Sequence, residues 1–170
     1  DRSRCICEEY CSENVLCISL SHAGTGKARN TRVKKAKGRW VIFLDSDDMI
    51  LHKVFNNDFF NYLQNMYMQG IDLILTPRVD CDFELKEKYN IIYPEKLEDI
   101  KYHMPKMSFF TGIYRREFLI DKKIEFFEYP KQDIESAFRY RVFSKTNNIY
   151  IERNKIFYLH RNNPFSNTNT

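Results

Sequence analysis

The stretch VIFLDSDDM carries three carboxylates, Asp45, Asp47 and Asp48, directly after an apolar run that begins at Trp40. Two like charges about 4 Å apart repel by roughly 4 kcal/mol at an effective dielectric constant of about 20, so folding alone gains little from this cluster. Residues two apart in an extended chain point to the same side, so the first two carboxylates can face one ligand. Carboxylate oxygens suit Mg²⁺ or Mn²⁺, which commonly bind through one or two carboxylates and substrate phosphates. The spacing also fits a solvated acidic turn in which one side chain caps the next helix.

Apolar patterning predicts the strands and helices that must hold these carboxylates in place. Helices are expected over residues 4–13, 26–37, 52–69 and 132–145, and strands over 15–20, 40–44, 71–76, 108–115, 148–152 and 155–160. In the third helix, Phe55, Phe59, Leu63 and Tyr67 recur every four residues and predict its buried side. Residues 77–107 carry few periodic signals and are expected to be irregular.

The alternation of strands and helices predicts an α/β protein with a mainly parallel sheet flanked by helices. In such sheets, ligands bind beyond the carboxyl ends of the strands. The three carboxylates follow the strand expected over 40–44, so they should lie at such an end. A chain of 170 residues suits one domain with a hydrophobic core.

Composition narrows the class of partner. The net charge of +4 is a mild excess of basic over acidic residues. An excess of this size does not indicate that the protein binds nucleic acid. No apolar run approaches the roughly 18 residues of a membrane helix, and the N-terminus lacks the apolar segment of a signal peptide. We therefore expect a soluble, cytoplasmic protein that binds no nucleic acid and that could associate peripherally with the inner face of a membrane.

The five cysteines are Cys5, Cys7, Cys11, Cys17 and Cys81. An odd count without a secretory signal argues against a disulfide framework. Cys7 and Cys11 lie four residues apart on an expected helix, and we predict that they are small, buried apolar residues. The alternative is a metal-binding or redox module in this N-terminal group, although the spacing fits no standard zinc pattern.

The stretch ARNTRVKKAKGRWVIFLDSDD, residues 28–48, resembles the signature of family 2 glycosyltransferases, which have the GT-A fold. In that family an A-R-N helix leads through A-x-G into a strand that ends in D-x-D or D-x-D-D. The matching residues are Ala28, Arg29, Asn30, Ala36, Gly38, Asp45, Asp47 and Asp48. The resemblance continues weakly to the C-terminus and implies a single GT-A-like domain over residues 1–170. Within it, residues 1–76 would bind the nucleotide-sugar, 77–161 would bind the acceptor, and 162–170 would form a mobile tail.

The resemblance implies a role for each residue of this signature. Asp47 would hold a divalent ion, Mn²⁺ or Mg²⁺, on the donor diphosphate, and Asp45 would contact the ribose or the sugar of the donor. Arg29 and Asn30 would line the nucleotide pocket, and a guanidinium also suits phosphate or pyrimidine oxygens. Asp1 matches the family's D-G-S motif and would bind the donor as well.

Two later motifs carry further implied roles. PKQDIESAFRYR places Asp133 where inverting members of the family have their general base, with Gln132 in place of the usual glutamate. A helix cap after Pro130 is the other explanation of this aspartate. FYLHRNNPFSN resembles the family's final strand and basic loop, so His160 would be a further metal ligand and Arg161 would hold the diphosphate. A structural role is the alternative for the histidine.

The implied activity is metal-dependent transfer of a sugar from a UDP-sugar to a hydroxyl of a glycan or lipid-linked acceptor, by an inverting single displacement. Family members begin with a strand, a helix and a second strand that would precede Asp1. We expect this chain to lack that unit, which would expose apolar sheet edges and favour self-association. The alternative is a non-catalytic remnant that binds nucleotide or a partner without turnover, and Gln132 supports it.

Overall fold

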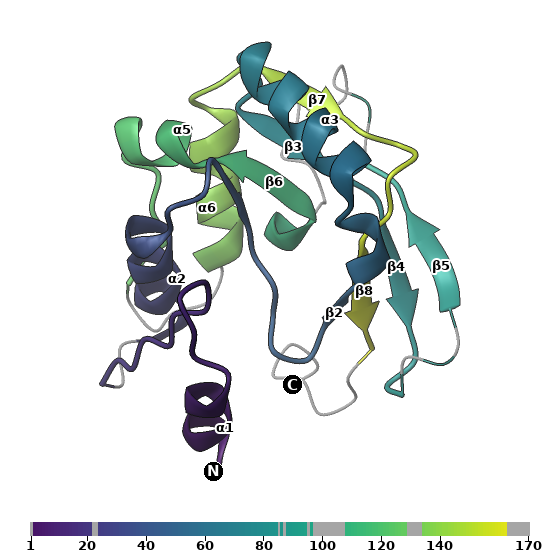
Figure 1. Cartoon of the computed structure of the whole chain (residues 1–170). Coiled ribbons are helices and arrows are strands. Elements are labelled where there is room, and N and C mark those ends of the chain that lie inside the picture. Colours follow the sequence, from purple (N-terminus) through teal and green to yellow (C-terminus); the bar gives the residue numbers. More distant parts are fainter. Residues whose placement is uncertain are drawn as a thin grey trace.

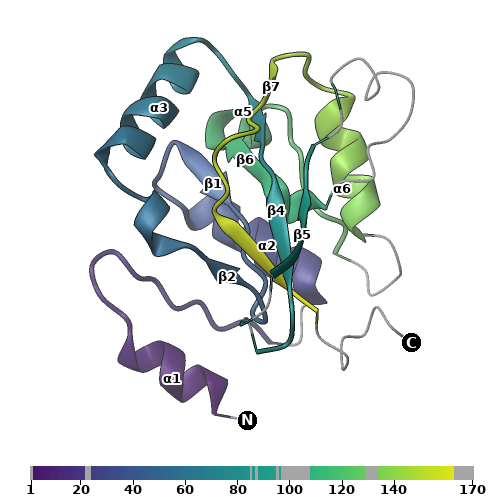
Figure 2. The same cartoon turned by 90° about the vertical axis from the view of Figure 1, so that its right-hand side faces the viewer.

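The computed structural model describes residues 2–21, 24–84, 86, 88–94, 96, 108–128 and 134–162. The chain opens with helix α1 (Ser3–Glu9), which has no buried residue. Figures 1 and 2 both show this helix apart from the body of the molecule. The strand predicted over 15–20 is wrong, because these residues pair with no strand of the described chain and Leu16 is 68% exposed.

The first sheet contains four strands in the order β1 (Trp40–Ile42), β6 (Gly112–Arg115), β3 (Leu73–Leu75) and β7 (Ile149–Ile151). Strand β6 is antiparallel to both β1 and β3, whereas β3 and β7 are parallel. Three of the strands therefore run in one direction, and β6 is inserted between two of them in the opposite direction. All three residues of β3 are buried, as its continuous apolar run predicts.

The second sheet has the order β2 (Met49–Ile50), β8 (Tyr158–Arg161), β4 (Arg78–Cys81) and β5 (Lys88–Ile92). Strands β4 and β8 are parallel, and the two outer strands pair antiparallel with them. The prediction of a mainly parallel sheet is thus wrong, because four of the six pairings between described strands are antiparallel. The prediction that residues 77–107 are irregular is wrong at β4 and β5, which pair with each other as antiparallel strands.

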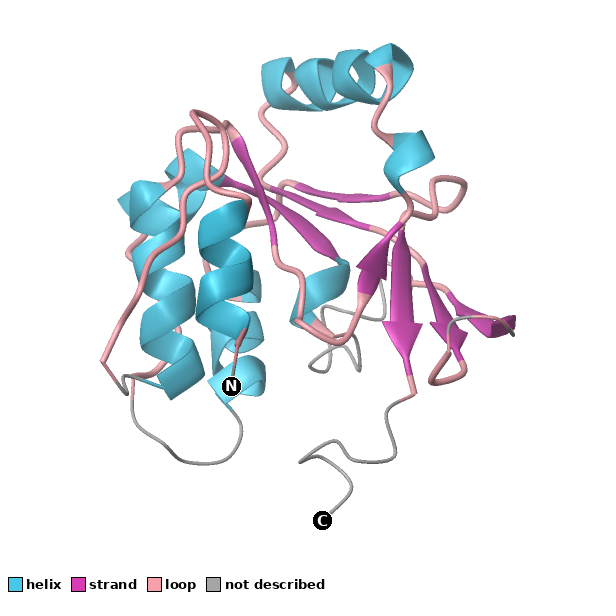
Figure 3. Ribbon diagram, turned by 60° about the horizontal axis from the view of Figure 1, so that its bottom comes forward, coloured by secondary structure: helices cyan, strands magenta, loops and turns pink. Residues whose placement is uncertain are grey.

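Four helices cover the sheets: α2 (Gly24–Lys35), α3 (Asn57–Met68), α5 (Arg116–Asp121) and α6 (Ile134–Phe143). Short 3₁₀ turns, η1 (His52–Val54) and η2 (Phe109–Thr111), precede α3 and β6. Figure 1 shows α2, α5 and α6 together on one side and α3 on another. In Figure 3 these helices lie beside the strands, on one side of the view. The helices predicted over 26–37, 52–69 and 132–145 are confirmed in position. Helix α2 begins and ends two residues earlier than predicted, and the described parts of α3 and α6 are shorter than predicted.

The main core is rich in aromatic rings. Phe43 is buried directly after β1, and its ring lies 5.3–5.9 Å from the ring centroids of Phe109, Tyr114, Phe126 and Phe138. Helix α3 buries Phe59, Leu63 and Met66, so two of its four predicted stripe residues are fully buried. Because Phe43 is held from several sides, the residues that follow it leave the sheet at a fixed position.

Candidate functional site

The predicted carboxylates form a turn between β1 and β2. The amide N–H of Asp48 donates to the carbonyl of Asp45 over 3.1 Å. Both of these side chains and that of Asp47 are partly buried. The sequence prediction that an apolar strand delivers three carboxylates to the end of a sheet is therefore confirmed in position.

Asp45 forms an ion pair with Arg29 from helix α2. Nη2 of the guanidinium lies 2.8 Å from Oδ1 of the carboxylate, and the arginine side chain is only 14% exposed. The guanidinium also lies over the ring of Phe109, with Cζ 4.2 Å from the ring centroid. Its Nη1 lies 3.4 Å from Oε1 of Glu135 on α6. Arg29 thus joins the end of β1 to the first turn of α6.

Glu135 has an altered acidity in this arrangement. Burial raises its pKa above the usual range, the positive charge of Arg29 opposes that rise, and the negative charge of Asp45 adds to it. A nearby like charge disfavours the charged form of Glu135, and a nearby cation favours it. Sequence reasoning missed Glu135, although its place two residues after Asp133 could have suggested it.

Asp48 is anchored by strand β8. The hydroxyl of Tyr158 donates to Oδ2 of Asp48, and the backbone N–H of Arg161 donates to Oδ1 over 2.9 Å. Burial raises the pKa of Asp48, and both hydrogen bonds and the charge of His160 oppose the rise. The charge of Asp47 adds to the rise. Asp47 directly precedes Asp48 and His160 directly precedes Arg161, so both residues lie near this anchor.

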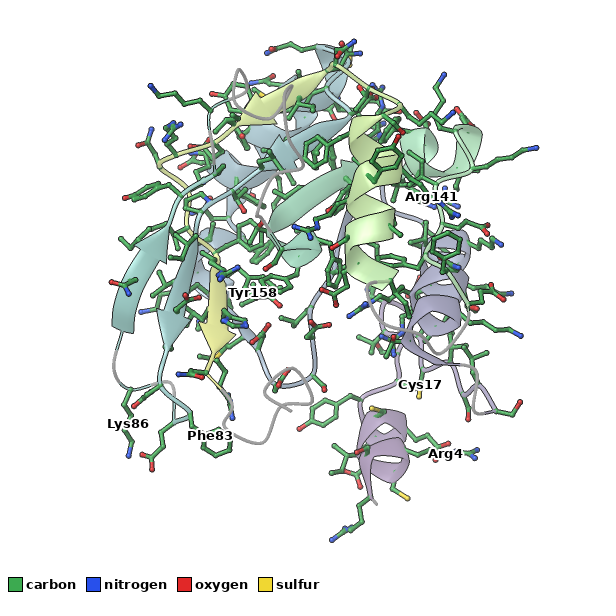
Figure 4. All side chains as sticks on the ribbon, turned by 180° about the vertical axis from the view of Figure 1, so that it is seen from behind. Arg4, Cys17, Phe83, Lys86, Arg141 and Tyr158 are labelled. Carbon is green, nitrogen blue, oxygen red and sulfur yellow. The ribbon has the colours of Figure 1, made fainter. Side chains whose placement is uncertain are left out.

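His160 lies on β8 beside β4. Its Nδ1 lies 3.2 Å from Oδ1 of Asp80, and its ring stacks on Phe110 at a centroid distance of 5.4 Å. The neighbouring Arg161 directs its guanidinium over the ring of Phe83, with Cζ 5.4 Å from the centroid. Figure 4 shows Tyr158 on β8 near the middle of the molecule and Phe83 at the far end of the β4–β5 ladder.

Asn30 is buried, and its side chain forms hydrogen bonds with the backbone of a neighbouring loop. Its Nδ2 donates to the carbonyl of Phe126 over 2.9 Å, and its Oδ1 accepts from the N–H of Phe126 over 2.8 Å. Both polar groups of the amide are thus engaged within the protein. Asp1, Asp133 and the tail residues 163–170 lie outside the described residues.

A cavity of about 710 Å³ lies between α2 and β1. Its lining includes Arg29, Val33, Trp40, Asp45 and Asp48. Ligand pockets for small molecules commonly have about 300–1,000 Å³ and a few polar groups on apolar walls. The carboxylate turn therefore forms the polar end of a cavity of suitable size.

The N-terminal cysteines lie elsewhere. Cys5, Cys7 and Cys11 are exposed, so the prediction that Cys7 and Cys11 are buried apolar residues is wrong. The reason is that the described part of the chain buries no residue of α1. In Figure 4, Cys17 lies near α1, away from Tyr158. Among the described residues, no three His, Cys, Asp or Glu side chains form a group that could hold a metal ion alone.

None of the helices in the described part of the chain has both the length and the apolar composition that a membrane span requires.

Comparison with known proteins gives a consistent result. The family model described as Glycosyl transferase family 2 matches residues 1–121. The chain is 34% identical to the minor teichoic acid biosynthesis protein GgaB of Bacillus subtilis over 82 residues. This match spans 45% of this chain and 9% of GgaB. The chain is also 26% identical to the uncharacterized glycosyltransferase EpsJ of the same bacterium over 187 residues. This match spans 98% of this chain and 51% of EpsJ.

Solved structures of TarS from S. aureus share the fold. TarS 1-349 in complex with UDP-GlcNAc matches with a TM-score of 0.72 and 24% identity, over 98% of this chain and 48% of that chain. TarS 1-349 in complex with UDP matches with a TM-score of 0.67 and 25% identity, over 96% of this chain and 48% of that chain. The chain thus spans about half or less of the length of these relatives.

These results confirm the GT-A fold that the D-x-D-D signature implies, with mixed sheets in place of a mainly parallel one. The family match covers 121 residues of the chain and includes the whole carboxylate turn and Arg29. The chain therefore belongs to glycosyl transferase family 2.

Proposed function

We propose that this protein transfers a sugar from a UDP-sugar to a hydroxyl of a glycan or lipid-linked acceptor, by an inverting single displacement. The observation that carries the proposal is the carboxylate turn at the polar end of the 710 Å³ cavity, held by Arg29 and Tyr158. The TarS structures that resemble this chain were solved with UDP and with UDP-GlcNAc, which supports a UDP-linked donor.

A divalent ion, Mn²⁺ or Mg²⁺, is part of the proposal. Asp47 and His160 would hold it. A carboxylate oxygen suits Mg²⁺ and Mn²⁺, and the neutral imidazole of a histidine is a common ligand of metal ions in proteins. Mg²⁺ keeps several waters and binds through one or two carboxylates together with substrate phosphates. A small protein donor set therefore fits an ion that is shared with the donor. When bound, the ion would stabilise negative charge on the leaving diphosphate as a Lewis acid.

The chain's own residues divide the remaining work. Asp45 would contact the ribose or sugar of the donor, and Arg29 would hold this carboxylate in place through its 2.8 Å ion pair. Asn30 would position the loop at Phe126. Nε of Arg161 is buried and makes no hydrogen bond within the described part of the chain, so a diphosphate oxygen is a suitable partner for this side chain.

Two residues outside the described ranges complete the proposal. Asp133 would accept the proton of the acceptor hydroxyl as that oxygen attacks the sugar. Asp1 would contribute to donor binding.

The name of the relative GgaB supports a cell-surface polymer as acceptor and a role in polysaccharide biosynthesis. The protein would work in the cytoplasm, at the inner face of a membrane, where it would meet a lipid-linked acceptor.

The test is release of UDP by the full-length protein with manganese, a panel of UDP-sugars and candidate acceptors. Asp47→Ala should abolish metal-dependent UDP binding, whereas Asp133→Asn should retain binding and lose transfer. Equal losses of UDP binding in both variants would refute this division of roles. UDP binding without transfer by the wild-type protein would instead indicate a non-catalytic remnant.

A further inference from the structure

The contact between Asp80 and His160 joins two parallel strands. The residues are register partners on β4 and β8. Oδ1 of Asp80 lies 3.2 Å from Nδ1 of the imidazole ring. The same oxygen lies 2.8 Å from Nε of Arg78, which is on the same face of β4. One carboxylate oxygen therefore contacts both the histidine ring and a guanidinium.

This carboxylate is itself held in place. Nη1 of Arg78 donates to the hydroxyl of Ser108 over 2.7 Å, and the arginine side chain is only 17% exposed. Arg78 also lies over the ring of Phe110, with Cζ 5.5 Å from the centroid. The His160 ring stacks on the same phenylalanine at an interplanar angle of 11°. Packing thus sets the plane of the imidazole, and the carboxylate sets its rotation.

The chemistry of the pair determines which ring nitrogen can bind a cation. An ionised carboxylate only accepts hydrogen bonds, so Nδ1 of His160 must carry the proton in this contact. The neutral ring then keeps its lone pair on Nε2. Histidines that bind metals commonly donate their other N–H to a carboxylate, which fixes the tautomer and the orientation of the ring.

We propose that Asp80 is a positioning residue that presents Nε2 of His160 to the divalent ion. The inference rests on the proposed function, because that function supplies the ion. It adds a residue from the β4 segment, which the sequence predicts to be irregular, to the donor side of the site. Asp80 itself does not touch the ion or the donor.

The first experiment measures Mn²⁺ binding to the full chain in the presence of UDP by electron paramagnetic resonance. We expect Asp80→Ala to weaken Mn²⁺ binding about 10- to 100-fold. The double variant Asp80→Ala/His160→Ala should bind no more weakly than His160→Ala, because Asp80 acts through the histidine. Asp82→Ala is the matched control: its carboxylate accepts from the N–H of Lys86 over 2.7 Å, and binding should equal that of the wild type.

The second measurement needs no metal, and its result is read from the wild-type chain. Nitrogen-15 NMR of the metal-free wild-type chain, at a pH where imidazole is neutral, should show His160 protonated at Nδ1. A spectrum of His160→Gln assigns the signals.

Two results separate the inference from the proposed function. A wild-type chain that binds no Mn²⁺ with UDP overturns the metal-dependent function and this inference together. Wild-type binding combined with additive losses in the double variant, or with His160 protonated at Nε2, overturns the role of Asp80 alone.

Discussion

At the scale of single residues, Arg29 combines several interactions in one side chain. It pairs with Asp45, approaches Glu135 and lies over Phe109. Removing it would leave two partly buried carboxylates without their cation, and such a loss costs more than the loss of an exposed ion pair.

Arg29→Ala should therefore lower the free energy of unfolding by about 1–3 kcal/mol, since hydrogen bonds to charged groups contribute amounts of this order. Urea denaturation of the purified chain measures it. Lys35→Ala on the same helix is the control, because Lys35 is exposed. The control should change stability by less than about 0.5 kcal/mol. Equal effects of the two changes would contradict the assigned role of Arg29.

The raised pKa of Glu135 predicts that the stability of the fold depends on pH. Its pKa is raised in the folded state above the ordinary value of 4.5. Between the ordinary pKa and the raised pKa of the folded state, the folded protein therefore binds more protons than the unfolded chain. The stability that Glu135 contributes is full below the ordinary value and is lost as the pH rises through the folded value.

Glu135→Gln removes this ionisation, so the stability of the variant relative to the wild type should increase as the pH rises above 4.5. Urea denaturation at a series of pH values measures the difference. Glu9→Gln on the exposed helix α1 serves as the control. A difference that stays flat, or that falls with rising pH, would show that burial does not raise the pKa of Glu135.

At the scale of elements, helix α2 is docked against the segment that follows α5. Asn30 holds both backbone groups of Phe126, and Gly26 lies one turn earlier. A Cβ atom added at Gly26 would lie 1.9 Å from the carbonyl oxygen of Phe127. The glycine therefore permits the approach that places Arg29 over the site.

Gly26→Ala should destabilise the fold by about 1–3 kcal/mol, because overpacking against the backbone exceeds the gain of up to about 1 kcal/mol in helix propensity. The midpoint of urea denaturation reports the change. Gly38→Ala is a matched control, because a Cβ there would meet its nearest atom at 3.4 Å. A Gly26→Ala chain as stable as the wild type would contradict the close docking of α2.

Local sequence predicts elements whose signal is complete within one segment. The apolar runs at Trp40 and Leu73 identify β1 and β3, and the four-residue spacing identifies α3. Strand β4 alternates charged and buried residues, Arg78, Val79, Asp80 and Cys81, and this short pattern is hidden in a polar segment. The direction of β6 depends on its two neighbours in the sheet, which no local pattern encodes.

The site shows the same division. The carboxylate turn lies within four residues and could be predicted from the sequence. The partners of Asp48 are 110 and 113 residues away along the chain, and the partner of His160 is 80 residues away. These contacts exist only after the two sheets have formed, so sequence patterns could suggest the site residues but not what holds them.

At the scale of the whole molecule, strand β8 connects the two cores with the carboxylate turn. Tyr158 belongs to the main aromatic core, whereas Leu159 packs with Val79 and Cys81 in a second core. The Tyr158 ring stacks on Phe110 at a centroid distance of 4.7 Å. Its hydroxyl donates to Asp48 and accepts from a backbone N–H of the same turn. One side chain therefore transmits the packing of both sheets to the proposed site.

Tyr158→Phe keeps the ring and its stacking but removes the hydroxyl, which leaves Asp48 partly buried with one donor fewer. The free energy of unfolding should fall by about 1–3 kcal/mol, the cost of an unsatisfied buried group. UDP binding with manganese should weaken as well, because the turn that carries Asp47 loses an anchor. Tyr140→Phe is the control, because Tyr140 is 65% exposed on α6. Calorimetric titration and urea denaturation of both variants decide the matter: unchanged UDP binding in a destabilised Tyr158→Phe chain would mean that the hydroxyl supports the fold and not the site.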